Sequence, residues 1–493
     1  MAENDIISLW QGTSSAPERE ELHGDLKADT VVIGAGLSGV LTAYLLSQQG
    51  QNVVIVESNK TGGGVTKNTT AKITSQHRLI YNKLISKYGE ELARQYAVAN
   101  ETAIKKYAEI IEQNKIDCGF MRLPAYVFTL DKPEKIEEEV EAATRLGIKA
   151  TFADRIELPF SIAGAERFDD QAQFHPLKFL YSIAKDLKIY ERTRALKVED
   201  NVVFTDRGNI TADNIVVASH FPFINMPGYY FVRMHQERSY VLAIKGTQQL
   251  NGMYVDESND GLSFREYDEY LLLGGAGHRT GQNPGDCYER LRGEARSIYP
   301  GSEEVYHWSA QDCITPDDVP YIGNYSIKTP NMYVASGYGK WGMTSSMVSA
   351  MIISSKIMKQ ECQFSEIFSP KRNAPPSSAG QIIADTGMAA AKLIAEKLYV
   401  PTEKVSHLKN GEGDIVLLND RKIGAYRDDD GKLYVVSTEC PHLHCQLSWN
   451  KDEKSWDCPC HGSRFDYRGN LIDNPAQSSI AIELKEKDEA VAR

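Results

Sequence analysis

The feature that most constrains the fold is a glycine motif placed between an apolar strand and a helix near the start of the chain. Three glycines have the spacing G-x-G-x-x-G, namely Gly34, Gly36 and Gly39. They follow the β-branched run 30–33 and open a helical pattern, and a second apolar strand, 53–56, ends at Glu57. In this setting the glycines permit a tight turn, close approach of a pyrophosphate and helix–strand packing, while the acid accepts from ribose hydroxyls. The motif predicts a βαβ unit that binds a dinucleotide.

The length and composition predict several folded domains. At roughly 100–200 residues per domain, a chain of 493 residues with 42% hydrophobic and 25% charged residues is globular throughout. Its formal net charge of -12 opposes attraction to nucleic acid and to anionic lipid surfaces. Nucleic acid is therefore not an expected partner.

The N-terminal sequence and the apolar runs bear on location. The first residues, MAENDIISLWQG, lack the basic and apolar regions of a signal peptide. The longest apolar stretch, 31–46, contains three glycines and is shorter than the ~20 residues that span a bilayer. We expect a cytoplasmic protein without membrane insertion.

Further along the chain, strand-like and helical patterns are interleaved. Helical spacing covers 81–115 and 132–146, and strand-like runs follow at 189–200, 202–204, 215–219, 238–244 and 269–273. A Pro/Ser-rich connector begins near Pro370, and an amphipathic helix is expected at 379–398. From about residue 405, short strands and Asn-Gly or Asp-Gly turns predict a small all-β module.

Segments around the flavin site of a known superfamily are similar to three stretches of this chain. After Glu57, glycines 62–64 precede hydroxyl side chains at Thr66, Thr69 and Thr70. These residues, with DDVPYIGN at 317–324 and NMYVASGYGKWGMTSS at 331–346, resemble the D-amino-acid oxidase, glycine oxidase and sarcosine oxidase superfamily. The resemblance implies FAD as cofactor. It also implies a closing segment whose amides and helix N-terminus face the flavin, with contributions from Gly337, Gly342, Met343 and Thr344.

The same resemblance implies the domain organisation. A lead-in at 1–27 precedes an oxidoreductase region at 28–368, in which an α/β Rossmann-like FAD-binding domain is interleaved with an α+β substrate domain. The FAD-binding parts are expected at about 28–80, 150–222 and 312–365, and the substrate parts at about 81–149 and 223–311. A linker and helix occupy 369–402, and the small all-β domain occupies 403–493.

A second glycine cluster, 274–277, is interpreted as a structural turn. The residues after it read as a loop, and no acid-terminated second strand follows at the required distance. The absence of a second dinucleotide motif argues against a pyridine-nucleotide:flavin reductase.

Near the C-terminus, two Cys/His pairs have the spacing of metal ligands. Cys440 and His442 form a C-x-H pair, Cys458 and His461 form a C-x-x-H pair, and fifteen residues separate the two pairs. Tetrahedral zinc is the alternative, but zinc sites usually use C-x-x-C and H-x-x-x-H pairs. One Cys and one His on each loop is what a Rieske 2Fe-2S cluster requires.

The strings CPHLHC and CPCHGS resemble the two loops of Rieske proteins. The resemblance implies that Cys440, His442, Cys458 and His461 hold a 2Fe-2S cluster and that Cys445 and Cys460 form a disulfide. Ser463 keeps a hydroxyl donor toward the cluster. His444 replaces the usual Gly and is expected to be exposed, while Phe465 replaces the Tyr of high-potential members, so a potential below the top of the Rieske range is expected.

A flavin takes two electrons and a Rieske cluster carries one at a time, so the two ends of the chain together predict an electron converter. The whole chain resembles a bacterial group of flavin oxidoreductases with a C-terminal Rieske domain. The resemblance implies dehydrogenation of a C–N bond in an amine or amino-acid-like substrate, with electrons leaving through the cluster to a partner protein. The alternative is an electron-transfer flavoprotein whose Rieske domain receives electrons from a partner while the flavin reduces an acceptor.

Two other classes fit the residues less well. A ring hydroxylase needs a mononuclear iron on two His and a carboxylate, and the sequence offers no persuasive set. A redox sensor without catalysis leaves the substrate domain unexplained.

The sequence supports substrate-side residues only weakly. Lys340 and Trp341 are expected beside the flavin ring, and Lys72 is expected to approach it from the Thr-rich segment. A solvent-facing lysine or a core tryptophan is an equally good interpretation. Arg233, Arg265 and His278 are weaker candidates, and the cation that would hold a substrate carboxylate is not located.

Overall fold

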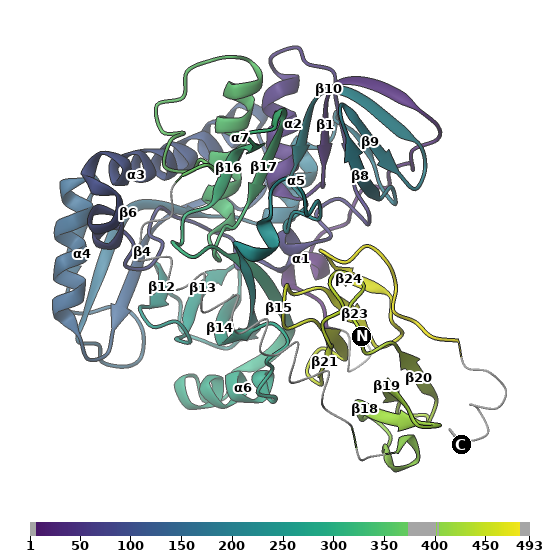
Figure 1. Ribbon diagram of the computed structural model, residues 1–493. Coiled ribbons are helices and arrows are strands. Elements are labelled where there is room, and N and C mark those ends of the chain that lie inside the picture. Colours follow the sequence, from purple (N-terminus) through teal and green to yellow (C-terminus); the bar gives the residue numbers. More distant parts are fainter. Residues whose placement is uncertain (1–5, 373–400, 402–403, 484–493) are drawn as a thin grey trace.

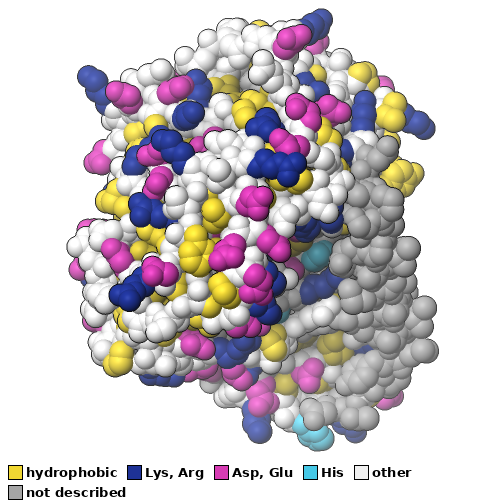
Figure 2. Space-filling model, turned by 90° about the vertical axis from the view of Figure 1, so that its left-hand side faces the viewer, with side chains coloured by type: hydrophobic (Ala, Val, Ile, Leu, Met, Phe, Trp, Pro, Cys, Tyr) yellow, Lys and Arg dark blue, Asp and Glu magenta, His cyan; other side chains and the backbone are white. Residues whose placement is uncertain are grey.

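The computed structural model describes residues 6–372, 401 and 404–483. Two large sheets with helices against them form the oxidoreductase part, and two small sheets form the C-terminal part, which packs against it (Figure 1). Over the face shown in Figure 2, acidic and basic side chains are interspersed, so the acidic excess is not gathered into one area there.

The first sheet is the dinucleotide-type sheet that the glycine motif predicts. Its order is β16-β17-β10-β1-β2-β7. Off this path, β9 pairs with β10, and β8 pairs with β9. Its strands are β1 (Leu26–Ile33), β2 (Val53–Val56), β7 (Lys188–Tyr190), β8 (Ala195–Glu199), β9 (Val202–Thr205), β10 (Asn209–Val217), β16 (Tyr321–Ser326) and β17 (Thr329–Ser336). β1 pairs in parallel with β2 and β10. All of 53–56 is buried, as expected for a parallel strand covered on both faces.

Four helices pack around the largest apolar core of the described chain. They are α2 (Leu37–Ser47), α3 (Tyr81–Asn114), α5 (Pro176–Ile183) and α7 (Gly342–Ile357). α2 contacts both α5 and α7, and α3 contacts α7. α3 bends at Gly89, whose φ of +81° is open to glycine at little cost. The helix predicted at 81–115 is thus confirmed.

The second sheet has the order β15-β11-β14-β13-β12-β4-β6-β3, with β5 on β6. Its strands are β3 (Lys72–Ile73), β4 (Met121–Thr129), β5 (Ala150–Ala153), β6 (Gly164–Gln173), β11 (His235–Lys245), β12 (Met253–Asp256), β13 (Ser263–Tyr267), β14 (Tyr270–Arg279) and β15 (Glu303–Ile314). α4 (Pro133–Arg145) packs near β5 and β6, and α6 (Cys287–Ile298) packs on β11 and β14. The helix expected at 132–146 is confirmed by α4.

Two expectations differ from this arrangement. The segment 150–222 is expected in the FAD-binding part, but β5 pairs with β6, and β6 pairs with β4, in the second sheet. The predicted turn at 274–277 is wrong, because these glycines lie inside β14, paired to β11 and β13. Local sequence does not reveal either pairing, because both depend on distant partner strands.

The lead-in at 1–27 is part of the fold in its described portion. Residues 26 and 27 already belong to β1, and α1 (Leu9–Gly12) carries two fully buried apolar side chains, Leu9 and Trp10. The indole Nε1 of Trp10 donates to the Thr69 carbonyl at 2.6 Å. α1 therefore anchors the Thr-rich segment from behind.

The C-terminal part is all-β, as predicted. One sheet contains β18 (Gly413–Leu418), β19 (Arg421–Arg427) and β20 (Leu433–Val436), and the other contains β21 (Ser448–Asn450), β22 (Ser455–Asp457), β23 (Arg464–Asp466) and β24 (Leu471–Asp473). Short 3-10 helices are η1 (Val65–Asn68), η2 (Tyr230–Val232) and η3 (Val405–His407). The helix expected at 379–398 lies outside the described residues.

Candidate functional site

A cavity of about 1110 Å³ lies where the two large sheets meet the C-terminal part. Its volume is above the upper end of the range for single-ligand pockets, roughly 300–1,000 Å³. Its walls come from the ends of β1, β2 and β10, from the face of β11, β14 and β15, and from the start of α7. The C-terminal part contributes residues 471–474 and Gln477. There is room for a large cofactor and a substrate together.

The glycine motif forms the turn at one end of this cavity. Gly34 has φ +108°, and a Cβ there would lie 2.6 Å from the Ala218 carbonyl oxygen. A Cβ on Gly39 would lie 2.0 Å from the Gly34 carbonyl oxygen, so this glycine serves helix–strand packing and does not itself line the cavity. Gly36 is the N-cap of α2 and does line it. The positive end of α2 therefore faces the cavity, as a pyrophosphate requires.

Glu57 and Thr66 lie on either side of this turn. The Glu57 carboxylate accepts from the amides of Ala35 and Asn59, both at 2.8 Å, and burial raises its pKa. The hydroxyl oxygen of Thr66 accepts from the Leu37 amide at 3.0 Å. Both side chains line the cavity, but Thr66 already satisfies one amide of the helix end.

The Thr-rich segment brings a buried amine into the cavity. Thr69, Thr70 and Lys72 all line it, and the Lys72 ammonium donates to the Thr70 hydroxyl at 3.2 Å. Burial, together with the charge of Arg265, lowers the pKa of Lys72 to about 7. Lys72 can therefore gain or lose a proton near neutral pH.

The closing segment lies at the start of α7. Gly337, Gly342 and Met343 line the cavity, whereas Thr344 does not. The Thr344 hydroxyl instead donates to the Thr74 carbonyl at 3.0 Å and lies 3.0 Å from His77 Nε2.

Trp341 also lines the cavity, and it stacks on His77 with 4.9 Å between ring centroids. Burial lowers the pKa of His77 to about 3, so this imidazole is neutral. Trp341 and the N-terminus of α7 are thus held at one wall of the cavity.

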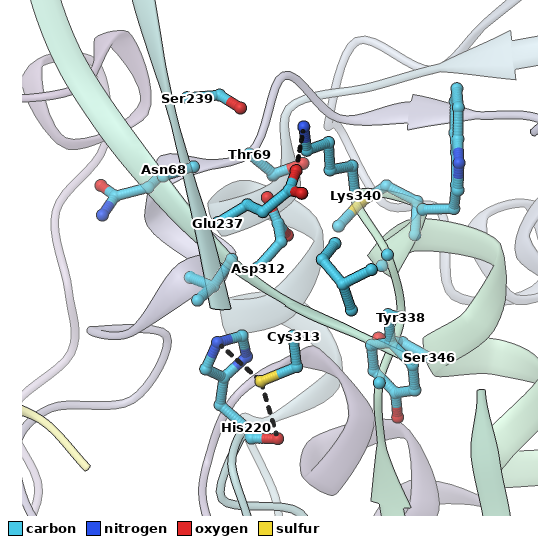
Figure 3. Close-up of a pocket in the computed structure, with 18 of the residues that line it drawn as sticks. Asn68, Thr69, His220, Glu237, Ser239, Asp312, Cys313, Tyr338, Lys340 and Ser346 are labelled. Atoms are coloured by element: carbon cyan, nitrogen blue, oxygen red, sulfur yellow. Dashed lines mark hydrogen bonds and ion pairs between the residues drawn. The ribbon is translucent and has the colours of Figure 1, made fainter. Parts of the chain in front are cut away.

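The wall formed by β11 and β15 carries two carboxylates that sequence reasoning missed. Glu237 on β11 and Asp312 on β15 are directly paired across the strands, and both line the cavity with Lys340 (Figure 3). The Lys340 ammonium lies 2.9 Å from the Glu237 carboxylate. Against the effect of burial, a hydrogen bond from His235 and this ion pair hold the pKa of Glu237 below its usual range. Burial raises the pKa of Asp312 to about 6.

The weaker candidates lie elsewhere. Arg233 stacks over Tyr321 and donates to the Pro370 carbonyl at 2.6 Å. Arg265 is fully buried and donates to Gln173 and to backbone carbonyls, and His278 bonds to Tyr240. None of the three lines the cavity.

A second site lies at the tip of the C-terminal part that faces the oxidoreductase part. Its two thiols, Cys440 and Cys458, are buried and within hydrogen-bond reach of each other. This contact holds the pKa of Cys440 below, and that of Cys458 above, the ordinary thiol value. The imidazoles of His442 and His461 lie 4.9 Å apart between centroids, and burial lowers their pKa values to about 4 and about 3. Both are neutral, as metal ligands must be.

The donor set fits a Rieske cluster. Nδ1 of His442 and Nδ1 of His461 are buried without a hydrogen-bond partner among the described residues. The expected disulfide is present, with 2.23 Å between the sulfurs of Cys445 and Cys460. Although the sulfurs of Cys445, Cys458 and Cys460 lie within 4.8 Å of one another, two of them are oxidised. Two thiols and two orphaned imidazole nitrogens remain to hold the cluster.

The structure shows where the residues that depart from the Rieske pattern lie. His444 is exposed and has φ +57°, the left-handed region in which Gly is favoured. Phe465 is fully buried in the core of this domain. Ser463 Oγ accepts from the Ala476 amide at 2.9 Å and lies within hydrogen-bond reach of the Cys440 thiol.

Within the described residues, every helix is too short or too polar to cross a bilayer.

Comparison with known proteins agrees with both sites. A family model described as FAD dependent oxidoreductase (DAO) matches residues 29–356, and a Rieske [2Fe-2S] domain model matches residues 398–484. The Bacillus subtilis (strain 168) protein YhfW, named as a Rieske 2Fe-2S iron-sulfur protein, is 37% identical over 95% of this chain and 96% of its own. Gamma-glutamylputrescine oxidoreductase of Escherichia coli (strain K12) is 21% identical over 76% of this chain and 93% of its own.

A solved structure shows the same fold in the larger part of the chain. Glycine oxidase from Geobacillus kaustophilus aligns with a TM-score of 0.61 at 17% identity, over 70% of this chain and 99% of that protein. The chain thus belongs to the FAD dependent oxidoreductase (DAO) family, and it is an oxidoreductase that binds FAD and carries a Rieske 2Fe-2S domain at its C-terminal end.

Proposed function

We propose that this oxidoreductase dehydrogenates the C–N bond of a cationic amine and passes the electrons, one at a time, from FAD through its own Rieske cluster to an acceptor protein. The observation that supports this most directly is the shared cavity. Residues of the dinucleotide motif, such as Gly34, and residues 471–474 of the Rieske domain line the same space. A substrate site and an electron outlet in one chain need this proximity.

The two cofactors divide the redox chemistry. When bound, FAD supplies the acceptor for a hydride, and the 2Fe-2S cluster supplies one-electron transfer. The side chains of this protein then have to bind the amine, orient it and remove one proton from its nitrogen.

The cavity wall formed by β11 and β15 favours a positively charged substrate. Glu237 and Asp312 carry two negative charges above pH 6, and Lys340 neutralises one of them. Cross-strand neighbours have Cβ atoms roughly 4.5–5.5 Å apart, so the two carboxylates form one recognition surface. A substrate ammonium placed against Asp312 restores charge balance, whereas a free carboxylate there is repelled. The name of the relative gamma-glutamylputrescine oxidoreductase is in keeping with an amine.

Lys72 is the group best placed to take the proton. It lines the cavity, and its pKa of about 7 leaves much of it as the neutral amine at neutral pH. Lys72 can therefore hold the proton that leaves the substrate nitrogen.

An anaerobic stopped-flow screen tests the proposal. Monoamines, diamines and amino acids are mixed with the oxidised holoenzyme, and the flavin and cluster absorbances are followed separately. A substrate amine is expected to bleach the flavin first and the cluster second. If no amine bleaches the flavin while an external protein donor reduces the cluster before the flavin, the chain is the electron-transfer flavoprotein of the alternative.

A substitution of Asp312 tests whether this wall recognises a cation. Asp312→Asn removes a charge-assisted contact of about 1.5–3 kcal/mol, which corresponds to a roughly 10- to 150-fold higher KM for a diamine. Asp318→Asn is the control, because this exposed carboxylate at the cavity rim pairs with Lys83 and faces solvent. Equal KM values for Asp312→Asn and wild type contradict cation recognition by this wall.

A further inference from the structure

The oxidoreductase part contacts a ligand imidazole of the cluster site directly. Nε2 of His442 lies 2.9 Å from the amide oxygen of Asn225, which follows β10 in the oxidoreductase part. The other ring nitrogen, Nδ1, is buried without a partner and is the one free to bind iron. Nε2 then carries the proton and donates it to Asn225.

An aromatic ring covers the same imidazoles. Phe231, in η2, meets His442 at 6.1 Å between centroids and 82°, and His461 at 5.8 Å and 79°. Both are edge contacts, and the two imidazoles are nearly perpendicular to each other. The histidine edge of the cluster site is therefore covered by the same chain's oxidoreductase part.

Neutral amides hold the second cluster loop in place. Gln236 donates to the His461 carbonyl at 2.6 Å, and Gln311 donates to the Gly462 carbonyl at 2.8 Å. Gln311 also donates to Gln236 at 2.7 Å, and all of these contacts are buried. A Cβ on Gly462 would lie 2.7 Å from the Gln236 side chain, so the loop is seated without spare room.

Asn474 makes a further contact between the Rieske domain and the oxidoreductase part. Asn474 donates to the Phe221 carbonyl at 2.7 Å and to the Ser219 carbonyl at 3.0 Å. These carbonyls lie in the segment between the end of β10 and Asn225. The Asn474 side chain therefore adds two docking bonds that go to backbone carbonyls and not to a ligand imidazole.

We infer that Asn225 is a positioning residue for the cluster, supplied by the oxidoreductase part, and that it lowers the reduction potential of the docked Rieske domain. Outer hydrogen bonds to a ligand imidazole orient the ring and raise its basicity. A more basic imidazole stabilises the oxidised iron, so the acceptor on Nε2–H favours the oxidised cluster. This inference depends on the cluster and its ligands, and it does not depend on the substrate proposed above.

Two substitutions with opposite expected signs test it in the full-length holoenzyme. Asn225→Leu removes the acceptor and is expected to raise the cluster midpoint potential. Asn225→Asp keeps the shape and strengthens the acceptor, so it is expected to lower the potential. The midpoint is read by redox titration with EPR detection of the reduced cluster, which requires no substrate, and iron content is measured for each variant.

Two controls separate this role from general effects. Met226→Asp places the same charge on the next residue, whose side chain is 68% exposed, and is expected to shift the potential less than Asn225→Asp. Asn474→Ala removes a docking contact but leaves the bond to His442, and is expected to leave the potential unchanged.

The inference is overturned if both Asn225 variants shift the potential in the same direction, or if Met226→Asp or Asn474→Ala reproduces the shift. If Asn225→Leu fails to retain iron, the near-isosteric Asn225→Asp decides alone, and an unchanged or raised potential overturns the assignment.

Discussion

A buried ion pair across the domain boundary gives the sharpest stability prediction. Arg238 of β11 is 1% exposed, and its guanidinium lies 3.3 Å from the Glu453 carboxylate of the Rieske domain. It also donates to Gln311 at 2.9 Å. Arg464 shares Glu453 at 3.3 Å and pairs with Asp473 at 3.1 Å. The side chains of Arg238, Glu453 and Arg464 are each at most 8% exposed, so water cannot replace a missing partner there.

The substitution Arg238→Met removes one partner and keeps most of the volume. Loss of one member of a buried ion pair costs about 3–5 kcal/mol when charge is left uncompensated, and without Arg238 the single cation Arg464 faces the three carboxylates of Glu453, Asp457 and Asp473. At an m-value of roughly 2 kcal/mol/M, the urea midpoint should fall by about 2 M. The assay is urea unfolding of the holoenzyme, with visible circular dichroism reporting the cluster and flavin fluorescence reporting the oxidoreductase part.

Arg94→Met is the matched control, since Arg94 pairs with Glu90 at 2.6 Å on the surface of α3. Exposed pairs contribute about 0–1 kcal/mol, so this variant should unfold close to wild type. The reasoning is refuted if Arg238→Met is no more destabilising than Arg94→Met, because the cross-domain charges would then be effectively solvated.

Three further changes test single features of the two sites. Phe465→Tyr should raise the cluster potential by about 60 mV, the one-electron equivalent of a ~1.5 kcal/mol hydrogen bond, and protein-film voltammetry showing no rise counts against it. Lys72→Met should remove the part of the fall in kcat/KM that is centred near pH 7, because the protonated lysine cannot accept a proton, while the fall near pH 6 from protonation of Asp312 should remain; a wild-type pH profile in this variant excludes Lys72 as the base. Gly281→Ala would place a Cβ 2.5 Å from the Pro459 backbone at a residue with φ +73°. Gly50 also has a positive φ but open space around it, so Gly50→Ala should cost only the ~1–2 kcal/mol of backbone strain. Gly281→Ala should therefore lower the free energy of unfolding, followed by the visible circular dichroism of the cluster, by more than Gly50→Ala does. Equal effects of the two glycine variants would show that the loop can move.

The parts of the structure that sequence predicts are those built from local patterns. The turn at Gly34 and the helix at 81–114 depend on neighbouring residues, and so do the Cys/His loops, whose ligands lie a few positions apart. Trp10 was treated as part of a polar lead-in, but its burial depends on contact with the distant Thr69 carbonyl. A local pattern carries no information about such a partner.

The wall that carries Glu237 and Asp312 is missed for the same reason, although one signal is present in the sequence. Glu237 and Asp312 become neighbours only when β11 pairs with β15. The glycines at 274–277 were interpreted as a turn, yet Gly274, Gly275 and Gly277 lie within β14 and line the cavity. Glycine inside a strand often marks close approach of a ligand, so a strand interpretation of this run would have located the wall.

The contacts that join the two redox sites suit a cluster whose charge changes during turnover. Gln236 and Gln311 are neutral amides that donate to backbone carbonyls and not to a ligand imidazole. The strength of such a hydrogen bond depends little on an added electron, whereas an ion pair in the same place would strengthen or weaken with each reduction. The charged pair of Arg238 and Glu453 adjoins these amides, since Arg238 donates to Gln311, but its hydrogen bonds go to other side chains and not to a ligand imidazole. The amide contacts can therefore hold the cluster loops in one position in both oxidation states, while the buried charges supply the stability.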